Sequence, residues 1–327
     1  MKYVKILAIT LASLLLVITI WCSVSYWPAA MLLRWVFNKE AIKTNEALLP
    51  LVPPTVKSTT NLVYTTAFPE SKLTIHYPEK YSANAATVVW IHGGGFLSGS
   101  KEQVENYCKI LSGKGFVVAA IDYLVGPEHH YPTPILQTMA ALEYLIKNAE
   151  KLGINKQKLV LAGDSGGAHI TAQVALAAYD TAYAATIPVV HTVDSSQLKA
   201  VVLHCGPHHV KNLPLSGVKG YLFNTFLWSY SGSRQATVEP SFESASVYHA
   251  VGNQFPKTLL TVGNADPLAG ESSVQMSQKL IQLNVPTTTV LFDKSYEPKL
   301  PHEFQFNFTF KESQLVLEKT VEFLEQL

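Results

Sequence analysis

Two kinds of apolar pattern alternate along most of this chain. Continuous apolar runs, several of which stop at Gly, Asp or His, are typical of strands buried on both faces of a sheet. Segments in which apolar residues recur every three or four positions are typical of amphipathic helices. The runs predict strands at 61–66, 72–77, 87–92, 116–122, from Leu159 to Gly163, and at 200–204, 257–262 and 287–292. The periodic segments predict helices at 101–112, 132–152, 168–179, 272–283 and 312–327.

This alternation indicates parallel βαβ units, because parallel strands need a crossover connection and a helix usually supplies it. The predicted fold class is therefore α/β, with a mostly parallel central sheet and helices on both faces. The segment 207–255 lies between two predicted strands and is too long for an ordinary loop. We expect it to form a cap over the carboxyl edge of the sheet. Its aromatic residues fit either a substrate pocket or the core of the cap: Tyr221, Phe223, Phe226, Trp228 and Tyr230.

The segment before the sheet, residues 28–58, ends in the proline-rich stretch 49–54. We predict one or two short helices here, as an N-terminal part of the cap, followed by a linker. The main domain then covers residues 59–327. A chain of 327 residues has room for one large α/β domain with such insertions.

The N-terminal segment 1–27 predicts a membrane anchor. Residues 6–27 carry no charge and would form a helix about 33 Å long, which is enough to cross a bilayer. Trp21, Tyr26 and Trp27 lie at its far end, where interfacial aromatic residues gather. A signal peptide is the alternative, although its apolar region is usually shorter and residues 23–25 make a poor cleavage site.

The charges around this segment suggest its orientation. Lys2 and Lys5 favour a cytoplasmic N-terminus, although Arg34, Lys39 and Lys43 beyond the span weaken that preference. The rest of the chain would then lie outside the cytoplasm, in the periplasm if the source is bacterial. If the segment is instead cleaved as a signal, the protein is secreted.

Charge and cysteine content exclude several other classes of protein. The net charge of +1 gives no reason to expect a nucleic-acid partner. Cys22, Cys108 and Cys205 are too few for a disulfide framework, and we expect no bridge between Cys108 and Cys205. The histidines at 204, 208 and 209 lack the carboxylate or thiolate partners of a metal site, so we predict no bound metal. The sequence does not indicate an oligomeric state.

A candidate nucleophile lies where a predicted strand passes directly into a predicted helix. Residues 163–167 read Gly-Asp-Ser-Gly-Gly, which is G-x-S-x-G in the strand–turn–helix context that gives the motif its meaning. So sharp a turn places Ser165 in strained backbone angles and exposes its hydroxyl. A Cβ at Gly163 or Gly167 would collide across the turn. The backbone N–H of Gly166, at the start of the helix, can face a developing oxyanion.

A second motif, about 70 residues earlier, fits the same chemistry. Residues 92–96 read His-Gly-Gly-Gly-Phe at the end of a predicted strand. Three consecutive glycines let the backbone approach a substrate and aim N–H groups at one of its oxygens. A flexible glycine turn would be the simpler interpretation, but the pairing of two such motifs disfavours it.

A serine hydroxyl attacks only when a histidine takes its proton, and that histidine needs an orienting carboxylate. Asp266 follows the strand predicted at 257–262, and His302 lies in the loop after the last predicted strand. Each could be an ordinary loop residue. The order Ser165, Asp266, His302, each after a strand end, is nevertheless the order of a Ser-Asp-His triad in this architecture.

Together these motifs resemble the α/β-hydrolases of the hormone-sensitive-lipase-like esterase group. H-G-G-G stands at 92–95 and G-D-S-x-G at 163–167, while 123–132 approaches the group's Y-x-L-x-P-E-H-x-x-P segment. The resemblance covers about residues 62–327. Two positions depart from the group: Glu303 replaces the usual glycine after the histidine, and Gly270 replaces an acidic residue often found there.

The resemblance implies roles for further residues. By matching position, the oxyanion donors would be Gly94, Gly95 and Gly166. Side chains near these motifs and in the cap are candidates for binding substrate: Phe96, Tyr123, His129 and Trp228.

The function predicted from the sequence is a membrane-anchored serine esterase that needs no metal or organic cofactor. Its substrate would be a small-molecule carboxylic ester, cleaved through an acyl-enzyme. An amidase or peptidase on the same fold is one alternative, because fold does not determine the leaving group. A catalytically inactive ligand receptor is another, although such a protein typically lacks a triad residue and all three are present here.

Overall fold

The computed structural model describes residues 2–188 and 193–327. Within these ranges eight strands form one sheet in the order β1-β2-β4-β3-β5-β6-β7-β8. Strands β1 and β2 are antiparallel to their neighbours, and β3 to β8 are parallel, so the sheet has the predicted α/β-hydrolase architecture. The strands are β1 (Lys57–Val63), β2 (Lys72–Tyr77), β3 (Thr87–Ile91), β4 (Val117–Ile121), β5 (Leu159–Asp164), β6 (Leu198–His204), β7 (Lys257–Val262) and β8 (Thr287–Leu291).

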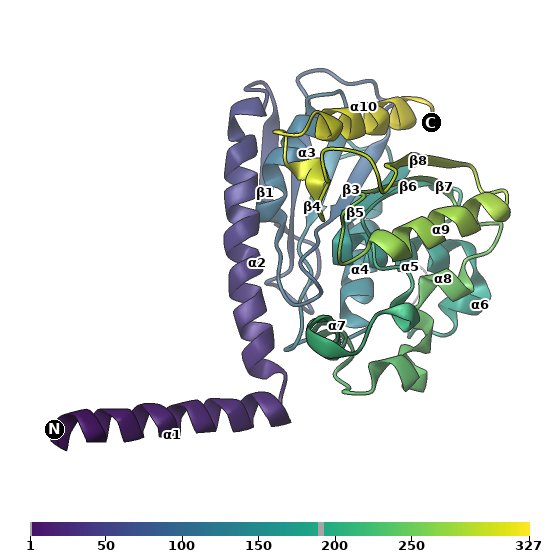
Figure 1. The fold of residues 1–327 in the computed structure, drawn as a ribbon. Helices are drawn as coiled ribbons and strands as arrows, with labels where there is room; N and C mark the ends of the chain where they lie inside the picture. Colours follow the sequence, from purple (N-terminus) through teal and green to yellow (C-terminus); the bar gives the residue numbers. More distant parts are fainter. Residues whose placement is uncertain (1, 189–192) are drawn as a thin grey trace.

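Helices cover both faces of this sheet (Figure 1). On one face α3 (Glu105–Ser112) and α10 (Lys311–Glu325) bury the outward side chains of the central strands, among them Val88 and Trp90. On the other face lie α4 (Thr133–Lys147), α5 (Ser165–Tyr179) and α9 (Gly270–Gln282), over side chains such as Val89 and Ile91. Strands β3, β4 and β5 are buried along their whole length, which explains why they read as continuous apolar runs.

The prediction of β1 was wrong by several residues, because β1 is an exposed edge strand. It pairs Lys57 with Tyr77 and carries almost no buried side chains, so no hydrophobic pattern marks its bounds. Helix α4 also ends five residues before the predicted position, where Asn148 turns its side chain back to the carbonyl of Tyr144. The helix predicted at 101–112 is divided into the 3-10 turn η2 (Lys101–Gln103) and α3.

The N-terminal region differs most from expectation. Helix α1 (Lys2–Val24) is followed by the single long helix α2 (Trp27–Leu48) and the 3-10 turn η1 (Leu49–Leu51), where one or two short helices had been predicted. Pro28 lies in the first turn of α2, where a missing N–H costs nothing, and the next proline is Pro50. Nothing therefore interrupts the helix between them.

Helix α1 has no contact with the sheet and projects from the body of the protein (Figure 1). It is long and apolar enough to cross a membrane over Lys2–Trp21, and none of that stretch is buried. Length and composition leave two interpretations, a membrane anchor or a signal sequence. The predicted segment begins at Met1, which lies outside the described residues.

The long segment between β6 and β7 is mostly helical. Helix α7 (Gly217–Ser231) is its largest element and packs against α2. The shorter elements there are η3 (Val210–Asn212), η4 (Ala236–Val238), η5 (Pro240–Ala245) and α8 (Val247–Ala250); α6 (Thr181–Ala184) and η6 (Phe304–Phe306) lie elsewhere in the chain. Helices α2 and α7, which are far apart in the sequence, both lie beside the carboxyl ends of the strands.

Candidate active site

The turn at Ser165 is as tight as the glycines suggest. Strand β5 ends at Asp164 and helix α5 begins at Ser165, with no residue between them. Ser165 has φ +50°, a left-handed angle that is strained for a residue with a side chain. A Cβ on Gly163 would lie 2.7 Å from the carbonyl carbon of Gly167, and one on Gly167 would collide with the backbone oxygen of Ile91. Only glycine fits these two positions.

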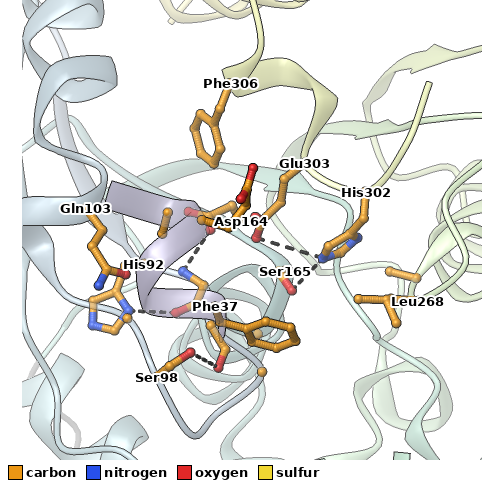
Figure 2. Close-up of a pocket in the computed structure, with 18 of the residues that line it drawn as sticks. Phe37, His92, Ser98, Gln103, Asp164, Ser165, Leu268, His302, Glu303 and Phe306 are labelled. Carbon is orange, nitrogen blue, oxygen red and sulfur yellow. Dashed lines mark hydrogen bonds and ion pairs between the residues drawn. The ribbon is translucent and has the colours of Figure 1, made fainter. Parts of the chain in front are cut away.

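Ser165, His302 and Asp266 form one continuous chain of hydrogen bonds. The Oγ atom of Ser165 lies 2.8 Å from Nε2 of His302, and Nδ1 of His302 lies 2.8 Å from Oδ2 of Asp266. Figure 2 shows the serine and histidine side chains converging from α5 and from the loop after β8. Asp266 has no exposed side-chain surface, and its Oδ1 accepts hydrogen bonds from the backbone N–H groups of Leu268 and Ala269. These three contacts with His302, Leu268 and Ala269 hold the carboxylate in one orientation.

Asn264 joins the two loops that carry the acid and the base. Its Oδ1 accepts a hydrogen bond from the N–H of Leu300, and its Nδ2 donates to the carbonyls of Asp293 and Tyr296. The loop after β7 is thereby tied to the loop after β8, which contains His302. The sequence did not mark this residue as functional. Its only indication was its position, two residues before Asp266 in a turn that begins with a glycine.

The pKa of His302 lies well above its ordinary value. Burial alone lowers this pKa, and it is the largest single influence; Cys205 and Asp266 act in the opposite direction and prevail. Burial in turn raises the pKa of the Cys205 thiol. The Asp266 carboxylate, hydrogen-bonded to Nδ1, stabilises the imidazolium.

The glycine loop after β3 lies directly beside Ser165. Gly94 (φ +114°) and Gly95 (φ +60°) have backbone angles that side chains rarely adopt. Ser98 folds back onto this loop, with its N–H and its hydroxyl both donating to the carbonyl of Gly94. The three residues named as oxyanion donors, Gly94, Gly95 and Gly166, all line the same cavity as Ser165 and His302.

Asp164 is a buried carboxyl group that the sequence analysis did not assign. Its Oδ1 accepts from the indole N–H of Trp90 and its Oδ2 from the N–H of Gly93, at 2.8 Å each. It therefore links the serine turn to the glycine loop. Burial, and after it the neighbouring Glu303, raise the pKa of Asp164 well above its ordinary value.

Glu303, noted above as a departure from the related group, lies inside the site. It has φ +57°, which agrees with a position where glycine is usual. Its Oε1 is 3.8 Å from Nε2 of His302, and its side chain lines the cavity (Figure 2). A carboxyl group is thus part of the cavity wall beside His302.

The cavity over Ser165 has a volume of about 340 Å³. Helices α2 and α7 supply one side of its apolar wall, through Phe37, Leu48, Phe223, Phe226 and Leu227. The aromatic residues of the cap therefore divide between the two uses that the sequence allowed. Phe223 and Phe226 face the cavity, whereas Tyr230 is buried and stacks on Phe96 at 4.1 Å between ring centroids.

Of the four predicted substrate-binding residues, Phe96 lines the cavity and the other three do not. The hydroxyl of Tyr123 donates to the carbonyl of His92, and its ring stacks on the His92 ring, so it supports the glycine loop from behind. The ring of His129 packs against Phe68. Trp228 lies on the side of α7 that packs against Tyr26 and Trp27. These three side chains therefore lie outside the cavity over Ser165.

The structure shows where the cysteines and histidines considered for a disulfide or a metal site lie. Cys108 and Cys205 are both free thiols, as expected. Within the described residues, ligand atoms of Cys205, Asp266 and His302 lie within 4.8 Å of one another. The hydrogen bond between His302 and Asp266 brings two of these three groups together. His204 stacks on Trp90, His208 on His169 and His209 on Tyr248, so these three histidines do not converge.

Comparison with known proteins agrees with this geometry. The family model described as BD-FAE matches residues 73–280. The chain is 34% identical over 107 residues to carboxylesterase NlhH of Mycobacterium tuberculosis, and 33% identical over 98 residues to lipase 2 of Moraxella sp.. These matches span only 34% and 23% of the two relatives. An arylesterase of Saccharolobus solfataricus is 27% identical over 262 residues, which cover 78% of this chain and 81% of that protein.

Solved structures show the same fold over nearly the whole chain. Esterase B of Lactobacillus rhamnosis, solved with a phosphonate inhibitor, has a TM-score of 0.76 at 24% identity and covers 91% of this chain and 95% of its own. An esterase of Pyrobaculum calidifontis has a TM-score of 0.72 at 23% identity, with 91% and 92% covered. The motifs, the sheet and the family match lead to one conclusion: the chain belongs to the BD-FAE family and has the α/β-hydrolase fold.

Proposed function

We propose that this protein is a serine hydrolase that cleaves carboxylic esters through an acyl-enzyme. The observation that carries the proposal is the chain of 2.8 Å hydrogen bonds from Ser165 through His302 to Asp266, at the floor of an apolar cavity. Relatives named carboxylesterase, lipase and arylesterase support the same chemistry.

Each residue has a defined task in this reaction. Nε2 of His302 takes the proton of Ser165 as the hydroxyl attacks the ester carbonyl, and later returns it to the leaving alcohol. Asp266 holds Nδ1 protonated, so that Nε2 is free to act as the base. The N–H groups of Gly94, Gly95 and Gly166 would stabilise the oxyanion, an effect worth about 3–4 kcal/mol per donor.

The test compares matched esters and amides. We expect the full-length protein to hydrolyse p-nitrophenyl esters from acetate to palmitate faster than the corresponding p-nitroanilides. Faster turnover of the anilides would favour the amidase or peptidase. No turnover of either series, with saturable binding of an ester, would favour a ligand receptor and overturn the proposal.

The activity is expected to rise with pH through the pKa of His302. Only the neutral imidazole accepts the serine proton, and the pKa of this group is raised, so the midpoint should lie above 6.5. An unperturbed histidine would place the midpoint near 6.5. A pH profile of kcat/KM with p-nitrophenyl butyrate measures the midpoint directly. A midpoint below 6 would contradict the raised pKa.

We further propose that α1 anchors the chain in a membrane, with the catalytic domain on the extracytoplasmic side. The support is an exposed apolar helix with lysines only at its N-terminal end. The protein should sediment with membranes and resist extraction by high salt, since about 20 apolar residues hold more tightly than a peripheral contact. Recovery of a soluble chain with its N-terminus near Ser25 would show a cleaved signal instead.

A further inference from the structure

Helix α2 has two faces with different surroundings. Its inner face lines the cavity through Phe37, Ala41, Thr44 and Leu48. Its outer face, defined here as Leu32, Trp35, Val36, Lys39, Ile42 and Lys43, is exposed along its length. Helix α2 therefore lies between the cavity over Ser165 and the outside of the protein.

The outer face is more apolar than a solvated surface requires. Leu32 and Trp35 are each 61% exposed and Ile42 is 49% exposed. They recur at a helical spacing, so they form one stripe rather than scattered contacts. Lys39 places its ammonium 5.3 Å from the centre of the Trp35 ring. A tryptophan beside lysines on an apolar stripe is typical of helices that lie at a membrane surface.

Helix α1 supplies the reason to name a bilayer as the partner. Only Ser25 and Tyr26 separate α1 from α2, and α1 runs crosswise to α2, away from the domain on the side of the outer face (Figure 1). The junction is held in place, because the rings of Tyr26 and Trp27 pack on Trp228 of α7. If α1 crosses a bilayer, α2 lies along the surface of that bilayer with its outer face toward the lipid.

We propose that the outer face of α2 docks on the bilayer that α1 crosses, and that the cavity behind it takes esters dissolved in that bilayer. The second half of this statement rests on the proposed esterase function. The charges on and beside this face are balanced, with Glu40 and Glu46 offsetting Lys39 and Lys43. Docking should therefore depend on apolar insertion and occur on uncharged phosphatidylcholine.

The cavity is placed to receive such a substrate. Glu40 is exposed and also lines the cavity, so the rim of the cavity reaches the edge of the outer face. Arg34, on the same helix, donates to the carbonyls of Leu97 and Gly126 and pairs with Glu128. These bonds fix α2 against the segment that follows the glycine loop. When α2 lies on the bilayer surface, the part of the cavity wall that α2 forms therefore lies at that surface as well.

The first test uses the full-length chain in phosphatidylcholine nanodiscs and two esters. One is water-soluble p-nitrophenyl acetate, and the other is 4-methylumbelliferyl oleate carried in the same nanodisc. The double variant Trp35→Glu/Ile42→Glu should lose at least about tenfold in turnover of the oleate, because charges oppose insertion, while acetate turnover stays within about twofold. The matched control is Ile281→Glu/Leu315→Glu, which changes exposed apolar residues on α9 and α10 and should alter neither rate.

The second test measures contact with lipid directly. A fluorophore on Ile42→Cys, in a Cys22→Ser background, should be quenched by a nitroxide-bearing phosphatidylcholine, and one on Ile281→Cys should not. Equal quenching at the two positions would overturn the docking. Quenching confined to Ile42→Cys with an unchanged ratio of oleate to acetate turnover would overturn the delivery of bilayer esters. Failure of the unmodified chain to hydrolyse either ester would instead overturn the esterase proposal, and the quenching result would stand by itself.

Discussion

Ser165→Ala is expected to lower kcat on p-nitrophenyl butyrate by about 10⁶-fold, and His302→Ala by a similar amount. The two side chains act as one unit, because the hydroxyl is nucleophilic only while Nε2, at 2.8 Å, takes its proton. Removing either member removes the attack altogether. The double variant should therefore be no slower than either single variant. Covalent labelling by a fluorophosphonate should also disappear in Ser165→Ala.

The control for this prediction is a histidine outside the hydrogen-bonded chain of Ser165, His302 and Asp266. His129 packs on Phe68, and His130 contacts the carbonyl of Ser229, so neither is hydrogen-bonded to Ser165. His129→Ala should keep kcat within about twofold of the unmodified enzyme. If His302→Ala kept more than about a tenth of the activity, His302 could not be the base. Undiminished labelling of Ser165→Ala would remove the nucleophile assignment.

Asp266→Asn is expected to reduce kcat/KM by about 10⁴-fold while leaving the fold intact. The carboxylate accepts from Nδ1 of His302 through Oδ2 and from two backbone N–H groups through Oδ1. Asparagine can keep the backbone contacts, but its amide group then donates toward Nδ1. That arrangement favours the imidazole tautomer with its proton on Nε2, which cannot accept from the serine.

The neighbouring carboxylates are not placed to replace Asp266. The closest is Glu303, whose Oε1 approaches Nε2 rather than Nδ1. Glu271 is hydrogen-bonded to Gln275. The full loss is therefore expected. Measurement of kcat/KM on p-nitrophenyl acetate, with Asp293→Asn as the control, checks this. A loss smaller than about tenfold would show that another carboxylate serves His302.

The buried strands and the order of the candidate triad were readable from the sequence, for one shared reason. A parallel strand buried on both faces must be apolar throughout, so β3 to β7 appear as runs that end at the site. Because such strands all present their carboxyl ends at one edge, the residues after them come together. Ser165, Asp266 and His302 are separated by 101 and 36 positions in the chain and still meet within hydrogen-bonding distance.

Motif glycines were equally informative, because their requirement is local. A Cβ at Gly163 or Gly167 collides within the turn itself, whatever the rest of the chain does. The sequence therefore determined the strained serine turn and the glycine loop beside it. It also determined that α1 is apolar enough for a bilayer, since that depends only on length and composition.

The tertiary structure alone decided what surrounds these residues. Trp228 and Phe226 are both aromatic and two positions apart on one helix, yet one packs on the N-terminal segment and the other lines the cavity. The roles of Asp164, Asn264 and Glu303 depend on contacts between segments far apart in the sequence. The same holds for α2. The role of one of its faces depends on packing against α7, and the role of the other depends on the direction of α1. Periodicity marks which side of a helix is apolar, but what that side meets is decided only by the packing of distant parts of the chain.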